Sequence, residues 1–177
     1  PEALGNFVAA LAQRYKGNIH AIQIWNEQNL AYENGGYVST DDARHYVEIL
    51  KVAYTRIKAV DPTIIVVSGA PASTAVESPG IAISDMRYYN AMFAYQDGVI
   101  RNYIDALGVH PAGSANPPET LWPLGPSQAQ GWTDHPTFYF RNVENVRSLM
   151  LEYGLADIPV WITEFGWATY NDTPGFE

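Results

Sequence analysis

The sequence predicts an α/β fold in which short parallel strands alternate with helices that cover them. Helical and strand-like segments take turns along the 177 residues, and the four strand-like runs are apolar and rich in β-branched residues. A glutamate follows closely on the first of these runs and on the fourth. Two architectures fit this order, an open doubly wound sheet and part of a (β/α)8 barrel, and the two glutamates decide between them.

The first helix is expected from Pro1 to Tyr15, where apolar residues recur at helical spacing. Proline suits the start of a helix, and Gly17 suits its end. The isoleucine-rich segment from Ile19 to Trp25 then predicts the first strand.

The second helix is the clearest in the sequence and is expected over Asp41 to Val60. Thr40 is its expected N-cap, the first turn is acidic, and the Asp61-Pro62 pair ends it. Thr63 to Ser68 is a continuous apolar run, which predicts a strand that is buried on both faces.

Two more helix–strand pairs and a long loop complete the pattern. Helices are expected over Ser84 to Tyr95 and Phe138 to Tyr153, and strands over Ile104 to His110 and Ile158 to Thr163. Between them, residues 111–136 form a loop rich in proline and glycine. Loops of this length are uncommon unless they have a function.

Composition excludes several classes of partner and cofactor. The net charge is −9, and the ten Lys and Arg are scattered, so a nucleic-acid partner is not expected. No apolar run is long enough to span a membrane, and the chain contains no cysteine. Gly-rich nucleotide motifs are absent, and His20, His45 and His135 show no metal-ligand spacing. We therefore expect no cofactor and no metal.

Glu27 and Glu164 stand at the carboxyl ends of the first and fourth expected strands, the position of active sites in parallel α/β folds. Each alone could be a helix N-cap or a salt-bridge partner. In a flat sheet the two would lie about 14 Å apart, at roughly 4.8 Å per strand. In a closed barrel, strands three apart face each other across the mouth, and their end groups can converge. The pair therefore favours the barrel.

Two carboxyl groups that meet at one bond are the requirement of glycoside hydrolysis. One acts as an acid and protonates the leaving oxygen, and the other attacks the anomeric carbon or activates water. The acid needs a raised pKa, whereas the second group must stay ionised. Glu27 and Glu164 are the candidates for these roles.

The segments around both glutamates resemble the clan A glycoside hydrolases, in particular families 5 and 39. The resemblance rests on Trp-Asn-Glu at 25–27 and Ile-Thr-Glu-Phe-Gly-Trp at 162–167. It implies that Glu27 is the acid/base at the end of barrel strand 4 and that Glu164 is the nucleophile at the end of strand 7. It also implies that Asn26 binds the 2-hydroxyl of the substrate.

The resemblance makes residues 1–177 a partial (β/α)8-barrel catalytic domain that holds strands 4 to 7. A complete barrel takes about 250 residues. Strands 1 to 3 and strand 8 are therefore expected from the same longer chain. A second copy of the chain that completes the barrel is the alternative.

Further substrate contacts are expected around the same strand ends. The resemblance suggests that His110 lines the subsite near the nucleophile, and Trp167 is placed to stack on a sugar ring. In the long loop, Trp122 and Trp132 could form a sugar platform or anchor the loop. The weaker candidates for substrate binding are Asn29, Asn116 and Tyr32.

Two positions depart from the pattern of the clan. Many members have proline after the acid/base, where this chain has Gln28. Many also carry a tyrosine that bonds the nucleophile, whereas here Pro111 and Ala112 follow His110. The first departure concerns the shape of a loop, and the second leaves ionisation of the nucleophile to another donor.

The function expected from these residues is a retaining hydrolase of β-linked glycosides or polysaccharides that uses no cofactor. Its partner would be a carbohydrate, and its place outside the cell or on the cell surface. The first alternative is an inactive carbohydrate-binding or structural barrel in a surface assembly. The second, a lyase or aldolase, would need a lysine or a metal cluster at the strand ends.

Overall fold

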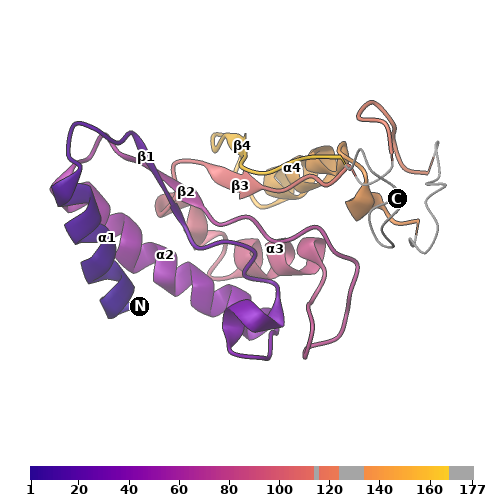
Figure 1. The fold of residues 1–177 in the computed structure, drawn as a ribbon, viewed down its shortest axis with the longest axis horizontal. Coiled ribbons are helices and arrows are strands. Elements are labelled where there is room, and N and C mark those ends of the chain that lie inside the picture. Colours follow the sequence, from indigo (N-terminus) through magenta and orange to yellow (C-terminus); the bar gives the residue numbers. More distant parts are fainter. Residues whose placement is uncertain (114–115, 124–133, 168–177) are drawn as a thin grey trace.

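The computed structural model of the chain describes residues 1–113, 116–123 and 134–167. Within these ranges helices and strands alternate from the first element to the last (Figure 1). The elements are α1 (Glu2–Arg14), β1 (Ala21–Ile24), α2 (Thr40–Val60), β2 (Ile65–Ser68), α3 (Asp85–Ala94), β3 (Leu107–Val109), α4 (Asn142–Glu152) and β4 (Val160–Ile162). Short 3-10 helices add Ala31–Asn34, Val99–Asn102 and Pro136–Phe138.

The predicted alternation of helices and strands is confirmed, with differences in the bounds. The first three helices differ from their predicted bounds by one residue at one or both ends, and Ser39, not Thr40, is the N-cap of α2. Every strand is shorter than predicted, because pairing with the neighbouring strand stops before the apolar run does. The last helix begins at Asn142 and not at Phe138, because a separate 3-10 turn over Pro136–Phe138 comes first. Tyr139 closes that turn by donating its backbone N–H to the carbonyl of Pro136.

All paired strands are parallel, as predicted. β1 pairs with β2, from Ala21 opposite Ile65 to Ile24 opposite Ser68, and β3 pairs with β4. A bridge between Val67 and Ala106 joins the two pairs. The described residues thus form a mixed α/β arrangement with short parallel sheets, and within these ranges the strands do not close into a barrel.

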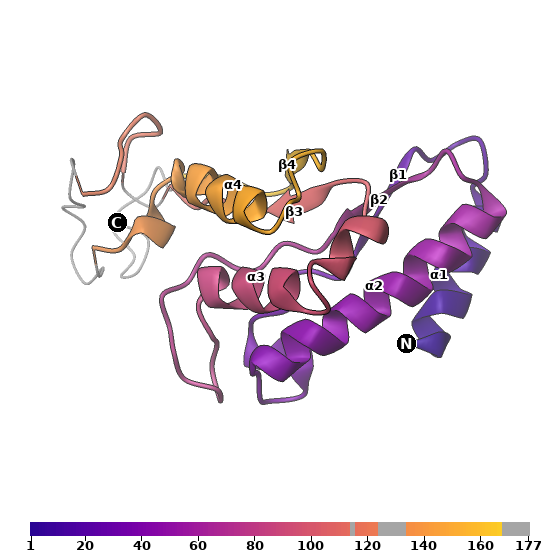
Figure 2. The ribbon, with the colours of Figure 1, turned by 180° about the vertical axis from the view of Figure 1, so that it is seen from behind.

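The helices lie next to one another along one side of the strands (Figures 1 and 2). α1 packs on α2, α2 on α3, and α3 on α4, so each helix covers the next in the order of the chain. The apolar stripes of the helices meet the strands in one continuous core. Among its largest fully buried side chains are Leu50, Ile57, Tyr89, Phe93 and Leu107. No helix within the described ranges is both long and apolar enough to cross a bilayer.

Two buried tyrosines on these helices fix the strand ends that carry the candidate site. The hydroxyl of Tyr46 on α2 donates to the carbonyl of Ile24 and accepts the backbone N–H of Gly69, both at 2.6 Å. Burial raises the pKa of Tyr46, so this hydroxyl keeps its proton. Tyr89 on α3 donates to the carbonyl of Gly108 at 3.0 Å. The carboxyl ends of β1, β2 and β3 are therefore held from the helix side.

A buried polar group ties the end of the long loop to α3. Asp85, at the start of α3, accepts hydrogen bonds from the Thr137 hydroxyl at 2.6 Å and from the Asn142 amide at 3.2 Å. Loss of hydration raises the pKa of Asp85 to about 6, although the Thr137 bond opposes the shift. This contact places the beginning of α4 beside α3.

The backbones of β2 and β3 approach so closely at Gly108 that no side chain fits. A Cβ atom built on Gly108 would lie 2.2 Å from the carbonyl oxygen of Ser68. We expect Gly108→Ala to lower the free energy of unfolding by about 1–3 kcal/mol, because one of the two strands must move. Chemical denaturation measures this change. Gly80→Ala is the matched control, since a Cβ there meets no atom within 4 Å, and an equal loss of stability in both variants would contradict the explanation.

Candidate active site

Three side chains from three strand ends converge on one small cavity. Glu27 follows β1, His110 follows β3 and Glu164 follows β4. His110 Nδ1 lies 3.4 Å from Glu27 Oε1, and His110 Nε2 lies 3.7 Å from Glu164 Oε1. One oxygen or nitrogen atom from each of the three lies within 4.8 Å of the others. The cavity, about 270 Å³ in volume, is lined by Glu27, Ala72, Ser73, His110, Pro111, Ala112, Glu164, Phe165 and Gly166.

The backbone after β1 turns sharply to aim Glu27 at this cavity. Trp25 and Glu27 adopt positive φ angles of 68° and 48°, a region that residues other than glycine rarely occupy. The turn is fixed on both sides. Glu27 donates its backbone N–H to the carbonyl of Ala70 at 2.9 Å, and the amide of Gln28 donates to the carbonyl of Gly69 at 2.8 Å. Gln28 thus anchors the corner to the end of β2.

His110 is held rigidly between the two carboxylates. Its side chain is 7% exposed, and the Ser73 hydroxyl donates to its backbone carbonyl. The same hydroxyl oxygen accepts the backbone N–H of Ala112 at 3.3 Å. His110 Nε2 is buried and forms no hydrogen bond with the described residues. The imidazole can therefore act on both glutamates without changing its position.

The number of protons in this cluster limits its chemistry. A neutral imidazole has one N–H donor, yet each of its two nitrogens faces a carboxylate oxygen. Both contacts become attractive only if His110 is protonated, if one glutamate is protonated, or if a cation lies between the groups. Glu27 is 28% exposed and Glu164 is 61% exposed, so both reach solvent and an incoming ligand.

Glu164 is followed by aromatic side chains that pack together beside the cavity. Thr163 donates its backbone N–H to the carbonyl of Val109 at 3.2 Å, which continues the β3–β4 pairing up to the glutamate. The rings of Phe140, Phe165 and Trp167 lie within 6.2 Å of one another, measured between their centres. Phe165 lines the cavity and is strongly exposed.

Asn26 and Trp167 lie beside the cavity and are not among its lining residues. Asn26 is exposed between the two strained residues, and its side-chain oxygen accepts from the Gln23 amide at 3.3 Å. The indole N–H of Trp167 donates to the carbonyl of Asn116 at 2.7 Å. Both residues border the site, and their contact with a sugar stays a prediction.

Two predicted substrate contacts lie away from the lining of this cavity. Asn29 is buried, donates to the carbonyls of Ala72 and Ile83 and accepts the backbone N–H of Ala72, so it shapes the corner after β1 instead of facing a ligand. Trp122 lies against a separate cavity of about 450 Å³ beside α3 and α4, which shares no lining residue with the site.

The remaining candidates divide between the interior, the surface and the undescribed part of the loop. Asn116 is buried and donates to the carbonyl of Phe138 at 2.9 Å, so it holds the loop together. Tyr32 is exposed, and its pKa is raised by desolvation first and then by the charges of Glu27 and Glu33. Trp132 lies outside the described residues.

Six of the nine lining residues of the cavity were not predicted as site residues, among them Ala72, Ser73 and Phe165. Ala72 and Ser73 follow the end of β2, where no charged residue indicates a site. Phe165 directly follows the nucleophile candidate, and its place next to Glu164 was the signal that could have identified it. The expectation of no metal also rested on spacing along the chain, whereas the fold brings Glu27, His110 and Glu164 together.

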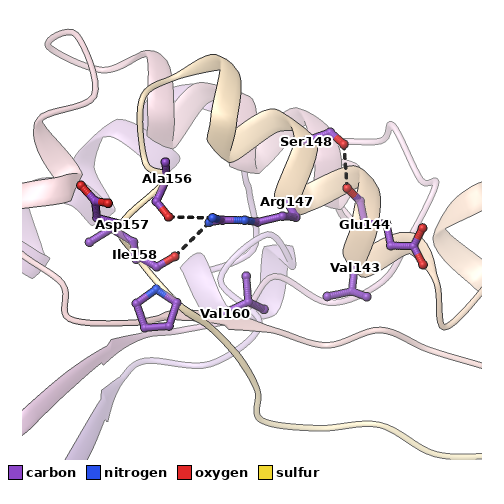
Figure 3. A pocket seen from close by; sticks show the side chains of 9 residues that line it. Val143, Glu144, Arg147, Ser148, Ala156, Asp157, Ile158 and Val160 are labelled. Carbon is purple, nitrogen blue, oxygen red and sulfur yellow. Dashed lines mark hydrogen bonds between the residues drawn. The ribbon is translucent and has the colours of Figure 1, made fainter.

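A larger cavity, about 710 Å³, lies between α4 and the segment that leads into β4 (Figure 3). The guanidinium of Arg147 points across it and donates to the carbonyls of Ala156, at 2.6 Å, and Ile158, at 3.0 Å. Arg147 is thus used to fix the backbone of the α4–β4 connection. This cavity reaches Val160 at the amino end of β4, opposite to the end where parallel α/β folds bind substrates, so we assign it a structural role.

Comparison with known proteins supports the fold. No family model matches the chain, and no curated protein matches it. Among solved structures, the chain is similar to a family 39 glycoside hydrolase from the gut symbiont Bacteroides cellulosilyticus WH2, with 19% sequence identity and a TM-score of 0.57. The similarity covers 93% of this chain and 29% of that one. The chain therefore has a glycoside hydrolase-like fold and spans less than a third of the similar structure.

Proposed function

We propose that the protein is a retaining glycoside hydrolase that cleaves β-linked glycosides or polysaccharides. In this proposal Glu164 attacks the anomeric carbon while Glu27 protonates the leaving oxygen, and Glu27 then takes a proton from the water that releases the sugar. The observation that carries the proposal is that both carboxylates line one cavity at the carboxyl ends of parallel strands. The similarity in fold to a family 39 glycoside hydrolase agrees with it.

The separation of the carboxyl groups favours retention over inversion. Inverting enzymes place the two groups about 6.5–9.5 Å apart to admit a water molecule, whereas retaining enzymes hold them about 5–5.5 Å apart. A carboxylate oxygen of Glu27 lies within 4.8 Å of one of Glu164. This distance leaves no room for an intervening water along with the sugar, so direct attack by Glu164 fits better.

His110 would support both steps from its place between the glutamates. A proton on Nε2 of the imidazole can donate to Glu164 and favour its ionised form, which is the task of the tyrosine that many clan members carry. Nδ1 on the other side of the ring faces Glu27 Oε1 at 3.4 Å, and donating to Glu27 as well would take a second proton on the imidazole. Phe165, exposed at the rim, offers a flat apolar surface for a sugar ring, and Asn26 beside Glu27 is the proposed contact to the 2-hydroxyl.

The rest of the barrel would come from the same longer chain. β4 exposes Trp161 and Ile162, two apolar side chains on an edge strand that a further strand and helix would cover. The similar structure is more than three times as long as the part that this chain matches, in keeping with such an arrangement. We propose that residues 1–177 are part of a catalytic domain of this kind and that the enzyme acts outside the cell on polysaccharide.

The configuration of the first product tests the proposal. The purified protein is mixed with aryl β-glycosides of several sugars, and proton NMR follows the anomeric signals. We expect hydrolysis of at least one substrate, with the β-anomer of the free sugar appearing first and the α-anomer growing only by mutarotation. Initial release of the α-anomer would show inversion and overturn the assigned roles.

An inactive carbohydrate-binding barrel is the second candidate, and the lining of the cavity favours it in one respect. His110 is followed by Pro111 and Ala112, so neither of these lining residues is a tyrosine that could bond the nucleophile. Binding of an oligosaccharide without hydrolysis, measured by calorimetry on the same protein, would support this candidate against the first.

A further inference from the structure

We propose that Glu27, His110 and Glu164 together bind a divalent transition-metal ion, with Zn²⁺ as the best match. The cluster offers one imidazole nitrogen and two carboxylate groups, the ligand types that Zn²⁺ takes together with water. The two carboxylates also balance the charge of the ion. This site is visible only in the fold, because its members come from three strand ends and lie far apart in the sequence.

The distance between His110 Nε2 and Glu164 Oε1 fits a tetrahedral zinc site. Zinc–nitrogen and zinc–oxygen bonds of about 2.0–2.1 Å at a tetrahedral angle place neighbouring ligand atoms about 3.4 Å apart. His110 Nε2 and Glu164 Oε1 are 3.7 Å apart, so a small rotation of the exposed Glu164 side chain brings them to this distance. One ligand atom each from Glu27, His110 and Glu164 lies within 4.8 Å of the others, so the cluster can supply three protein ligands, and water takes the fourth position.

The state of His110 is a second, independent indication of a cation. Nε2 is buried and has no hydrogen-bond partner among the described residues, although it faces the Glu164 carboxylate. If Nδ1 carries the proton and donates to Glu27 Oε1, an unshared electron pair on Nε2 faces the negative charge of Glu164. A cation between them turns this repulsion into two bonds.

The consequence for activity rests on the proposed function. A bound ion would occupy both the acid/base group and the nucleophile, so Zn²⁺ should inhibit hydrolysis in competition with the substrate. Removal of the ion by a chelator should restore the rate. Acid should weaken binding, because the ligands must lose their protons before they bind the metal.

Calorimetric titration of zinc chloride into chelator-treated protein tests the site without reference to activity. We expect one site per chain, with a dissociation constant in the micromolar range. The variants Glu164→Gln and His110→Gln should each bind zinc at least about tenfold more weakly, because each loses a ligand. His45→Gln is the matched control, since His45 is exposed on α2, away from the cluster, and its loss should leave binding unchanged.

The outcomes separate this proposal from the proposed function. Equal zinc affinity in the wild type, Glu164→Gln and His110→Gln would overturn the site, as would absence of binding at millimolar zinc. Glu164 is 61% exposed, so its substitution should leave the fold intact, and circular dichroism verifies this for both variants. Zinc binding at the cluster without glycosidase activity would support the metal site and contradict the proposed function. Glycosidase activity without zinc binding would support the proposed function and contradict the metal site.

Discussion

Glu164→Gln is expected to reduce turnover of an activated aryl β-glycoside by roughly a thousandfold or more. Glutamine has nearly the shape of glutamate but cannot form the glycosyl–enzyme bond. Glu164 is largely exposed, and its backbone is held through the β3–β4 pairing and not by its side chain. The fold should therefore persist while the reaction stops, which steady-state kinetics and circular dichroism would show together.

The control for this variant is Glu152→Gln, an exposed glutamate on α4 that does not line the cavity. It should keep the full rate. A second variant, Glu164→Ala, opens space for a small external anion, so added azide should restore cleavage and give a glycosyl azide of inverted configuration. Wild-type turnover by Glu164→Gln would refute the assignment of the nucleophile.

Glu27→Gln is expected to slow hydrolysis by an amount that depends on the leaving group. With an unactivated alkyl or sugar leaving group, loss of the proton donor should cost about 10²–10⁴-fold in rate. A dinitrophenyl leaving group departs without a proton, so formation of the glycosyl–enzyme should be nearly normal. Release of the sugar should still be slow, because the general base is missing, and a burst of dinitrophenol followed by slow turnover is the expected time course.

A comparison of the two variants separates the two roles. Glu27→Gln should show the burst and Glu164→Gln should not, because only the latter lacks the nucleophile. If both variants lost activity equally on every substrate, with no burst, the roles assigned to Glu27 and Glu164 would have no support. The pH–rate profile adds a readout, since Glu27→Gln should remove the fall in rate on the alkaline side that loss of the acid's proton produces.

Sequence reasoning predicted the order of the elements and the two strand ends that matter most. Apolar residues at helical spacing predicted the helices, and runs of β-branched residues predicted the strands, because a buried face requires apolar side chains at regular positions. Charged residues directly after apolar runs then marked Glu27 and Glu164 as a pair. Their proximity was expected from a barrel, in which the ends of strands three apart face each other across the mouth, and the structure places one oxygen of each within 4.8 Å of the other.

Other features depend on contacts that leave no local pattern. Asn29 lies two residues after Glu27 and looks equally available in the sequence, yet its amide is used by the backbone around Ala72. The loop residue Trp122 turned out to border a different cavity. His110 was identified as a site residue, but its position between two carboxylates could not be predicted from the residues around it. The two glutamates come from strands that lie far from each other in the sequence.

The positive φ angles of Trp25 and Glu27 mean that the turn after β1, which orients the proposed acid group, lowers the stability of the fold. A non-glycine residue held in that region costs on the order of 1–3 kcal/mol. Glycine substitution at these two positions would therefore relieve backbone strain and raise the free energy of unfolding. The same substitution would remove Glu27, the proposed acid group, or loosen the turn that orients it. Engineering for heat tolerance should begin elsewhere, on helix surfaces remote from the end of β1.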